Sequence, residues 1–206
     1  MAKSVPADAA QTRYSTVAIV LHWALAALVF ANLWLGLQSN GLKGLALFNL
    51  LQLHKSIGIT ALLLTLARLG WRIGHPPPPH PAHMATWEKA AATATHLAFY
   101  VLILGLPLTG WIMVSASPLG LPTLLFKAVP WPHIGFVHAL PLDQRKALED
   151  LMAKVHGTLG LGAMLLIALH VGAALKHQFF NRDEVLWRIA PFRALRPGGL
   201  QGEDVG

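Results

Sequence analysis

Two histidines, His156 and His170, lie fourteen residues apart in the apolar stretch 151–177. Fourteen residues of α-helix turn by about 1400°, which is about 40° short of four full turns, and rise by about 21 Å. Both imidazoles therefore face one side of a single helix at two depths. Because ionisable side chains inside an apolar span are costly, they are candidates for ligand binding or redox chemistry.

The helix that carries these histidines is one of four apolar stretches, each close to the roughly 20 residues that cross a bilayer. We expect spans at about residues 16–37, 48–71, 90–114 and 151–177. Of the 206 residues, 54% are hydrophobic and 12% are charged, whereas about 25% of a typical soluble domain is charged. The composition predicts a single all-α domain, an integral membrane four-helix bundle. We expect residues 192–206, which are rich in glycine, to be a disordered tail.

The charged residues predict the orientation of the bundle. The net charge is +7, but the basic residues flank apolar spans, so we attribute them to orientation in the membrane and expect no binding of nucleic acid. Ten of the 16 lysines and arginines fall on the side of the two termini and six on the other. The excess predicts that both termini are cytoplasmic.

The chain has 11 histidines and no cysteine, which excludes disulfides, iron–sulfur clusters and covalently attached haem. His54 and His156 lie near the starts of the second and fourth spans, on the non-cytoplasmic side. His22 and His170 lie at the cytoplasmic level. Each level thus combines one histidine of the last helix with one of another helix, which is the requirement for a haem with two axial histidines. We predict two b haems, one between His54 and His156 and one between His22 and His170.

Arg68 lies fourteen residues after His54, on the same helix face and at the depth of the second haem. The apolar spans hold no acidic residue to pair with it. A haem propionate would supply the missing negative charge through bidentate contacts. Glycines beside the ligands would leave room for a flat macrocycle, and these are Gly58, Gly157 and Gly160.

Two further histidines are alternatives at the cytoplasmic level. His177 lies one heptad beyond His170 on the same face and could replace it as a ligand, but the depth of His170 matches His22 better. His96 has a suitable depth and no obvious partner. With Arg72, these two histidines form a candidate quinone site on the cytoplasmic side, where histidine can transfer protons near neutral pH.

The sequence resembles the prokaryotic cytochrome b561 family. The similar stretches are LHW at 21–23, HKSIGITALLLTLARLGWRIGHPPPP at 54–79, HLAFYVLILGLPLTGWIMVSAS at 96–117 and VHGTLGLGAMLLIALHVGAALKHQFFNRDEVLWRIAP at 155–191. The resemblance implies a four-helix, two-haem quinone oxidoreductase of the bacterial inner membrane, with His22, His54, His156 and His170 as the iron ligands. For one branch of the family it also implies oxidation of superoxide at the periplasmic face, with ubiquinone as the electron acceptor.

A superoxide anion would be attracted by positive side chains on the periplasmic side. The basic residues predicted there to steer it are Lys55, Lys127, Arg145, Lys146 and Lys154. No residue is assigned a catalytic role beyond this steering.

Two other functions compete with this one. The chain could be an electron-transfer subunit whose donor is a periplasmic protein, with the apolar connection 115–147 as its docking surface. It could also be a metal permease lined by histidines. The number of haems in the purified protein and its reaction with superoxide alone distinguish the three functions.

Overall fold

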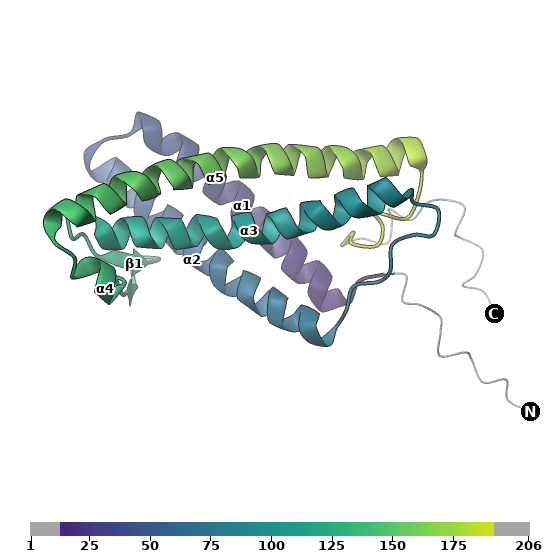
Figure 1. Ribbon diagram of the computed structural model, residues 1–206, viewed down its shortest axis with the longest axis horizontal. Coiled ribbons are helices and arrows are strands. Elements are labelled where there is room, and N and C mark those ends of the chain that lie inside the picture. The colour runs from purple at the N-terminus through teal and green to yellow at the C-terminus, as the bar shows by residue number, and fades with distance from the viewer. Residues whose placement is uncertain (1–12, 192–206) are drawn as a thin grey trace, which may run out of the picture.

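The computed structural model describes residues 13–191 and consists mainly of four long helices (Figure 1). These helices are α1 (Thr16–Gln38), α2 (Gly44–Gly74), α3 (Thr86–Ala116) and α5 (Leu142–Lys176). All four are long and apolar enough to cross a membrane. The expected spans fall inside these helices, except that His177 lies just beyond α5. The helices also extend past most expected ends, because polar residues at the edges of a span continue the helix.

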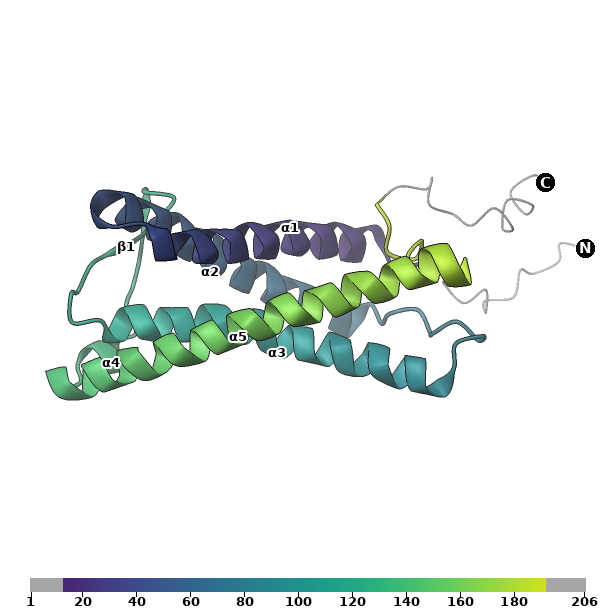
Figure 2. The ribbon, with the colours of Figure 1, turned by 90° about the horizontal axis from the view of Figure 1, so that it is seen from above.

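The four helices are arranged as two pairs. α1 packs mainly on α2, and α3 packs mainly on α5, with weaker packing of α2 on α3. Seen from above, the α1–α2 pair lies beside the α3–α5 pair, and α5 runs along nearly the whole length of the molecule (Figure 2). Side chains of the α1–α2 pair can therefore face side chains of the α3–α5 pair across the space between them.

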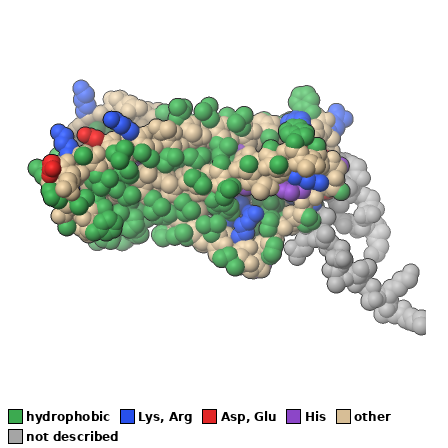
Figure 3. All heavy atoms as spheres, viewed as in Figure 1, with side chains coloured by type: hydrophobic (Ala, Val, Ile, Leu, Met, Phe, Trp, Pro, Cys, Tyr) green, Lys and Arg blue, Asp and Glu red, His purple; other side chains and the backbone are tan. Residues whose placement is uncertain are grey.

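Large apolar side chains cover the outside of the bundle. Phe30, Leu165 and Leu169, for example, are more than half exposed. Figure 3 shows hydrophobic side chains over most of one face, with lysine and arginine mostly towards the two ends. Exposed apolar side chains along helices of this length are typical of contact with lipid.

One end of the bundle is capped by the segment that connects α3 to α5. After α3 the chain forms a hairpin of β1 (Thr123–Leu125) and β2 (Val129–Trp131), and then the single turn α4 (Gly135–His138). The strands are antiparallel, with Leu124 opposite Pro130. We call residues 117–141 the outer cap.

Buried polar side chains of the long helices hold the outer cap in place. Gln52 of α2 donates to the carbonyl of Pro122 at 2.7 Å and accepts from the amide of Leu124 at 3.1 Å. Ser56 accepts from the amide of Phe126 at 2.8 Å. Because Gln52 and Ser56 are almost fully buried, their hydrogen bonds have no competition from water, and the cap is fixed to α2.

The other end of the bundle is closed by residues from both ends of the described chain. Residues 75–85 between α2 and α3 are not helical, as their prolines predict. After α5 comes η2, a π-helical turn (His177–Asn181), and then Arg182 with a left-handed backbone. The following segment folds back, so that Trp23 donates to the carbonyl of Ile189 at 2.9 Å and the amide of Tyr14 donates to Arg188 at 3.2 Å. The tail predicted to be disordered, 192–206, lies outside the described residues.

Candidate functional site

His54 of α2 and His156 of α5 face each other across the space between the two helix pairs. Their ring centroids are 6.0 Å apart and the ring planes are inclined at 73°. The two residues lie towards the end of the bundle that carries the outer cap, so we call them the outer pair. The structure thus brings together two histidines that are 102 residues apart in the sequence.

The Nδ1 atoms of the outer pair both contact main-chain carbonyls. His54 Nδ1 lies 3.1 Å from the carbonyl oxygen of Asn32, and His156 Nδ1 lies 3.0 Å from that of Leu106. The hydroxyl of Thr109 is also 3.1 Å from His156 Nδ1. Since a carbonyl can only accept, Nδ1 carries the proton and Nε2 keeps its lone pair. This is how metal-binding histidines are usually oriented.

His22 of α1 and His170 of α5 form the inner pair, at the opposite level of the bundle. Their ring centroids are 6.4 Å apart. Phe99 of α3 packs against His170 with a centroid distance of 5.1 Å, and Trp23 packs against His22 at 5.6 Å. The inner pair therefore also connects the two helix pairs, and aromatic rings restrict both imidazoles.

The separations of the two pairs fit the chemistry of a shared iron. A first-row metal binds an imidazole nitrogen at about 2 Å, so two imidazoles on opposite sides of one iron place their ring centroids about 6 Å apart. The separations of 6.0 and 6.4 Å match this value without rearrangement of the helices. The donor set of two neutral nitrogens is also suited to b-type haem.

His96 of α3 is a second neighbour of His170, at a centroid distance of 6.1 Å. However, α3 packs directly on α5 within one helix pair, so a macrocycle between His96 and His170 would have to displace that packing. His22 approaches His170 from the other helix pair, as His54 approaches His156. The arrangement of the helices therefore favours His22 as the partner of His170.

Two glycines that the sequence analysis did not identify lie against the outer pair. A Cβ atom added to Gly110 of α3 would lie 3.3 Å from His156 Cε1, and one added to Gly36 of α1 would lie 3.6 Å from His54 Cε1. Of the glycines that were identified, Gly157 and Gly160 border open space, whereas Gly58 lies against the Asn32 amide at 3.3 Å. Gly58 therefore allows α1 to approach α2 and leaves no room for a macrocycle.

Arg68 lies at the level of the inner pair, as expected. Its guanidinium is 3.4 Å from the carbonyl of Ala18, one helical turn before His22. Arg68 and Arg72 both line a pocket at this end of the bundle, together with Tyr14, Ala18, Trp71, His75, Pro77 and Tyr100. Two guanidinium groups in one pocket are suited to binding carboxylates.

Of the three residues of the candidate quinone site, His96 and Arg72 are close enough to interact electrostatically, whereas His177 has other contacts. His96 packs on His170, whereas the Arg72 guanidinium lies 6.0 Å from the centre of the Tyr100 ring. His177 contacts Asp183 and Asn181. No hydrogen bond or ring contact joins the three residues in the part of the chain that the structure describes.

The five basic residues predicted to steer superoxide lie at the end with the outer cap, but they differ in their contacts. Lys127 is exposed at the tip of the hairpin, and Lys146 and Lys154 are exposed on α5. Arg145 instead donates to the carbonyls of Ala116 and Ser117, which end α3. Arg145 therefore also has a structural function.

His133 of the outer cap lies among positive groups. Its ring centroid is 5.1 Å from that of His138, and its Nε2 is buried without a hydrogen bond. Burial lowers the pKa of His133, and the nearby His138, Lys55 and Arg145 lower it further. Lys55 and Arg145 therefore interact electrostatically with a side chain of the outer cap.

The histidines do not form a site of the kind that a transported divalent cation needs. Within residues 13–191, no group of three or more histidine, aspartate or glutamate side chains is arranged to hold a metal ion. A zinc site usually has three or four such ligands. The outer level offers two imidazoles and the inner level three, from His22, His96 and His170.

Comparison with known proteins gives matches over most of the chain. The family model described as prokaryotic cytochrome b561 matches residues 13–192. Cytochrome b561 homolog 2 of Escherichia coli (strain K12) is 30% identical over 180 residues, which cover 86% of this chain and 90% of that protein. Cytochrome b561 homolog 1 of the same organism is 29% identical over 188 residues, covering 88% and 98%. The probable superoxide oxidase CybB of Yersinia pestis is 24% identical over 180 residues, covering 87% and 96%.

Proposed function

The chain belongs to the prokaryotic cytochrome b561 family of membrane electron-transfer proteins, and on this premise we propose that it is a superoxide:ubiquinone oxidoreductase of the bacterial inner membrane. Electrons enter from superoxide at the end with the outer cap and leave to ubiquinone at the end with both termini. Two histidine pairs at two levels of the bundle carry this proposal. In each pair, the distance between the ring centroids is the distance expected for two imidazoles that bind one iron.

We assign one b haem to each pair. His54 and His156 hold the outer haem, and His22 and His170 hold the inner haem. When bound, haem iron supplies a centre that accepts and releases one electron at a time. The carbonyls of Asn32 and Leu106 orient the two outer imidazoles so that Nε2 faces the space between the helix pairs.

Arg68 binds a propionate of the inner haem in this proposal. A partly buried guanidinium needs a negative partner, and bidentate contact with a carboxylate provides one. No aspartate or glutamate side chain pairs with Arg68 among the described residues, where its guanidinium contacts the carbonyl of Ala18.

Superoxide as the donor is supported by the charge at the outer end and by a relative named a probable superoxide oxidase. Lys55, Lys127, Arg145, Lys146 and Lys154 attract the anion and raise its rate of encounter. This steering weakens as ionic strength rises, because the Debye length falls from about 10 Å at 0.1 M salt to about 3 Å at 1 M.

Ubiquinone is assigned to the inner end, where Arg72 and Tyr100 line a pocket that also includes Arg68. His96 lies beside the inner pair, and His177 lies at the end of α5. Reduction of a quinone needs two electrons and two protons. Two one-electron centres in one chain can supply the electrons, and titratable side chains near the inner end can supply the protons.

The haem content of the purified protein tests the assignment. We expect two haems per chain in the wild type and one in each of His54→Ala, His156→Ala, His22→Ala and His170→Ala, with the same spectral component lost within each pair. His177→Ala should keep both. Loss of the inner component in His177→Ala, but not in His170→Ala, would show that the inner pairing is wrong.

Superoxide and quinone are tested with the purified protein in detergent. We expect superoxide alone to drive the reduction of ubiquinone, with a rate that falls as salt is added. The combined variant Lys127→Gln/Lys146→Gln should show a lower rate at low salt and a weaker dependence on salt. An unchanged salt dependence in this variant would rule out steering by these lysines.

A periplasmic protein donor is the second candidate, because the outer cap carries exposed apolar side chains. Phe126 is 59% exposed and Phe136 is 78% exposed. In that case the protein would reduce ubiquinone slowly with superoxide and rapidly only with a redox partner. Fast turnover with superoxide alone would exclude the second candidate.

A further inference from the structure

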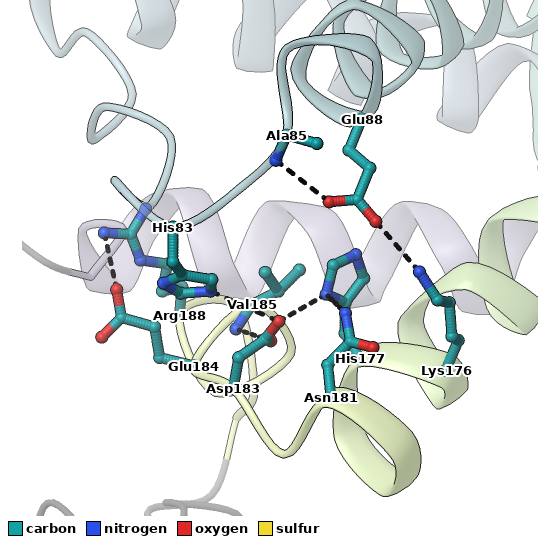
Figure 4. A network of polar contacts seen from close by, with 10 residues as sticks. All are labelled: His83, Ala85, Glu88, Lys176, His177, Asn181, Asp183, Glu184, Val185 and Arg188. Atoms are coloured by element: carbon teal, nitrogen blue, oxygen red, sulfur yellow. Dashed lines mark hydrogen bonds and ion pairs between the residues drawn. The ribbon is translucent and has the colours of Figure 1, made fainter.

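At the inner end of the bundle, Asp183 lies between two histidines from different parts of the chain (Figure 4). Its Oδ2 is 2.6 Å from His177 Nδ1 and 3.5 Å from His83 Nε2. His177 begins the π-helical turn after α5, whereas His83 belongs to the proline-rich connection between α2 and α3. These contacts make a continuous row of three titratable side chains, which we call the inner triad.

The inner triad runs from water into the protein. The His83 side chain is 57% exposed, whereas those of Asp183 and His177 are only 8% and 9% exposed. Only the first member of the row can therefore exchange protons freely with solvent. A proton that reaches His177 from solvent along the triad passes through Asp183.

The backbone at the end of α5 positions the carboxylate. Arg182 adopts a left-handed conformation with φ of 54°, which reverses the chain after the π-helical turn. The amide of Val185 donates to Asp183 Oδ1 at 3.0 Å. One carboxylate oxygen is thus fixed by the main chain, and the other is left for the two imidazoles.

The contacts of His177 Nδ1 suit two positions of a proton. Asp183 Oδ2 and the side-chain amide of Asn181, at 3.1 Å, both approach this nitrogen. With the proton on Nδ1, the imidazole donates to the carboxylate. With the proton on Asp183, the single lone pair of the nitrogen accepts from the carboxyl group, in competition with the amide. The Asn181 amide has no acceptor at this nitrogen while Nδ1 carries the proton, so it contacts the lone pair only in the second arrangement.

Two further ion pairs lie near the inner triad. Lys176 forms an ion pair of 2.9 Å with Glu88 of α3, next to His177. Arg188 forms an ion pair of 3.1 Å with Glu184, and its guanidinium also donates to the carbonyl of Pro79. Burial raises the pKa of Asp183, but hydrogen bonds from His177, Val185 and His83 outweigh it and lower the pKa overall. Asp183 is therefore ionised near neutral pH and can accept a proton.

We propose that His83, Asp183 and His177 form a proton path that supplies the protons for reduction of ubiquinone. His177 is seven residues beyond His170, which places it about 10.5 Å further along the helix and on nearly the same face. The inner end of the triad thus lies on the face of α5 that carries the inner pair. This inference rests on the assignment of the quinone to the inner end.

The path balances the reaction at the quinone. One quinone takes up two electrons, delivered one at a time, and two protons to give one quinol. Each proton enters at His83 and moves to Asp183, which passes it to His177 Nδ1 when this nitrogen is unprotonated, while His177 releases the proton on Nε2 towards the quinone oxygen. The imidazole ring then rotates back to present the unprotonated nitrogen to Asp183 before the next transfer. Two such transfers complete one quinol.

The test separates proton delivery from electron entry. The two-haem protein is reduced with stoichiometric dithionite and mixed with a short-chain ubiquinone, and its reoxidation is followed by haem absorbance between pH 6 and 9. We expect Asp183→Asn and His177→Ala to slow reoxidation at the alkaline end by about a hundredfold, with unchanged spectra. The solvent deuterium isotope effect should increase in both variants.

Chemical rescue distinguishes a proton path from a structural defect. Sodium formate, a small weak base, should restore reoxidation in Asp183→Asn, whereas sodium chloride should not. Glu184→Gln is the matched control, because it breaks the ion pair with Arg188 in the same segment and leaves the triad intact. His80→Ala removes an exposed histidine of the same connection and should behave as wild type.

Each outcome is decisive. If Asp183→Asn and His177→Ala are reoxidised at wild-type rates at every pH, the proton path is wrong while the quinone function stands. If Glu184→Gln is as slow as Asp183→Asn and formate restores neither, the segment has only a structural function. If the reduced wild type fails to react with ubiquinone, both the proposed function and the proton path are wrong.

Discussion

The two histidine pairs differ in the contacts of their Nδ1 atoms. Carbonyls of Asn32 and Leu106 accept from the outer pair, whereas no hydrogen bond of His22 or His170 is found within residues 13–191. A hydrogen bond from Nδ1 to a carbonyl makes the imidazole a more basic ligand, which stabilises ferric iron. A cation such as Arg68 beside the inner site has the opposite effect. Both differences predict a lower reduction potential at the outer site.

The potential of the inner site should therefore depend on Arg68. We expect Arg68→Gln to lower the inner midpoint potential by on the order of tens of millivolts and to leave the outer one unchanged. Redox titration of the two spectral components measures both. An equal shift of the two potentials would mean that the substitution disturbs the bundle rather than the inner site.

The outer site should be sensitive to the size of residue 110. A methyl group in Gly110→Ala would lie 3.3 Å from His156 Cε1, which is tighter than an ordinary contact, whereas in Gly36→Ala it would lie 3.6 Å from His54. We expect the first change to cost about 1–3 kcal/mol by overpacking and to lower the outer haem content. The second should be tolerated. Haem content and thermal unfolding of the two variants test this difference.

Neither the carbonyl partners nor these glycines were identified from the sequence. A main-chain carbonyl is present at every residue, so no residue type marks Asn32 or Leu106 as an acceptor. Glycine is common in membrane helices, so Gly36 and Gly110 did not stand out by type. Each of these glycines lies fourteen residues after a histidine of its own helix, and this spacing would have identified both.

At the scale of the helices, one spacing is repeated in all four. A residue at the inner level is separated by fourteen positions from one at the outer level, and the pairs are His22 and Gly36, Arg68 and His54, His96 and Gly110, and His170 and His156. Because fourteen residues bring the chain back to nearly the same helix face, each helix faces both levels. The sequence analysis used this spacing in only two of the four helices.

The apolar connection 115–147 was considered as a docking surface, and its strands were not predicted. Each strand has only three residues, and β2 contains Pro130. The hairpin is held by Gln52, which is 70 residues from Pro122 in the sequence. A contact between residues so far apart in the sequence cannot be predicted from the residues around either one. A polar residue inside a span also suggests a functional site before it suggests an anchor for a loop.

The outer cap should become less stable as the pH falls. The pKa of His133 is lowered in the folded cap, mainly by burial, so an undocked cap binds protons more readily. The stability due to neutral His133 is complete above the usual pKa of 6.5 and is lost as the pH falls below it. We expect hydrogen-exchange protection of residues 117–141, corrected for intrinsic rates, to decrease from pH 7.5 to pH 5.5.

His133→Gln is the control for this effect. Glutamine cannot take up a proton, so the protection should become nearly independent of pH in this range. If the wild type shows constant protection between pH 7.5 and pH 5.5, His133 does not control the docking of the cap.

At the scale of the whole molecule, composition and hydropathy were sufficient to predict an all-α membrane bundle with four spans. What they could not predict is how the helices pair. Lipid-facing and interior residues are equally apolar here, so hydrophobic periodicity carries little information about packing. The histidines supplied only part of that information, because they predicted that α5 faces α1 and α2 but not that it packs mainly on α3.

The charge asymmetry gives a prediction for the whole molecule. Ten lysines and arginines on the side of the termini against six on the other predict cytoplasmic termini. A fluorescent protein fused after residue 206 should therefore fluoresce, and alkaline phosphatase inserted at the hairpin tip near Lys127 should be active. Activity of a phosphatase fused to the C-terminus would reverse the orientation and exchange the proposed donor and acceptor sides.

The position of α5 in the chain has a consequence for biosynthesis. Both histidine pairs include a residue of α5, which follows the other three long helices in the described part of the chain. Neither pair exists while only α1, α2 and α3 have entered the membrane, so each haem of the proposed assignment would gain both of its ligands only after α5 is synthesised. A chain released early in α5 would have three inserted helices, no complete ligand pair, and one imidazole each from His22 and His54 facing an unfilled side of the bundle.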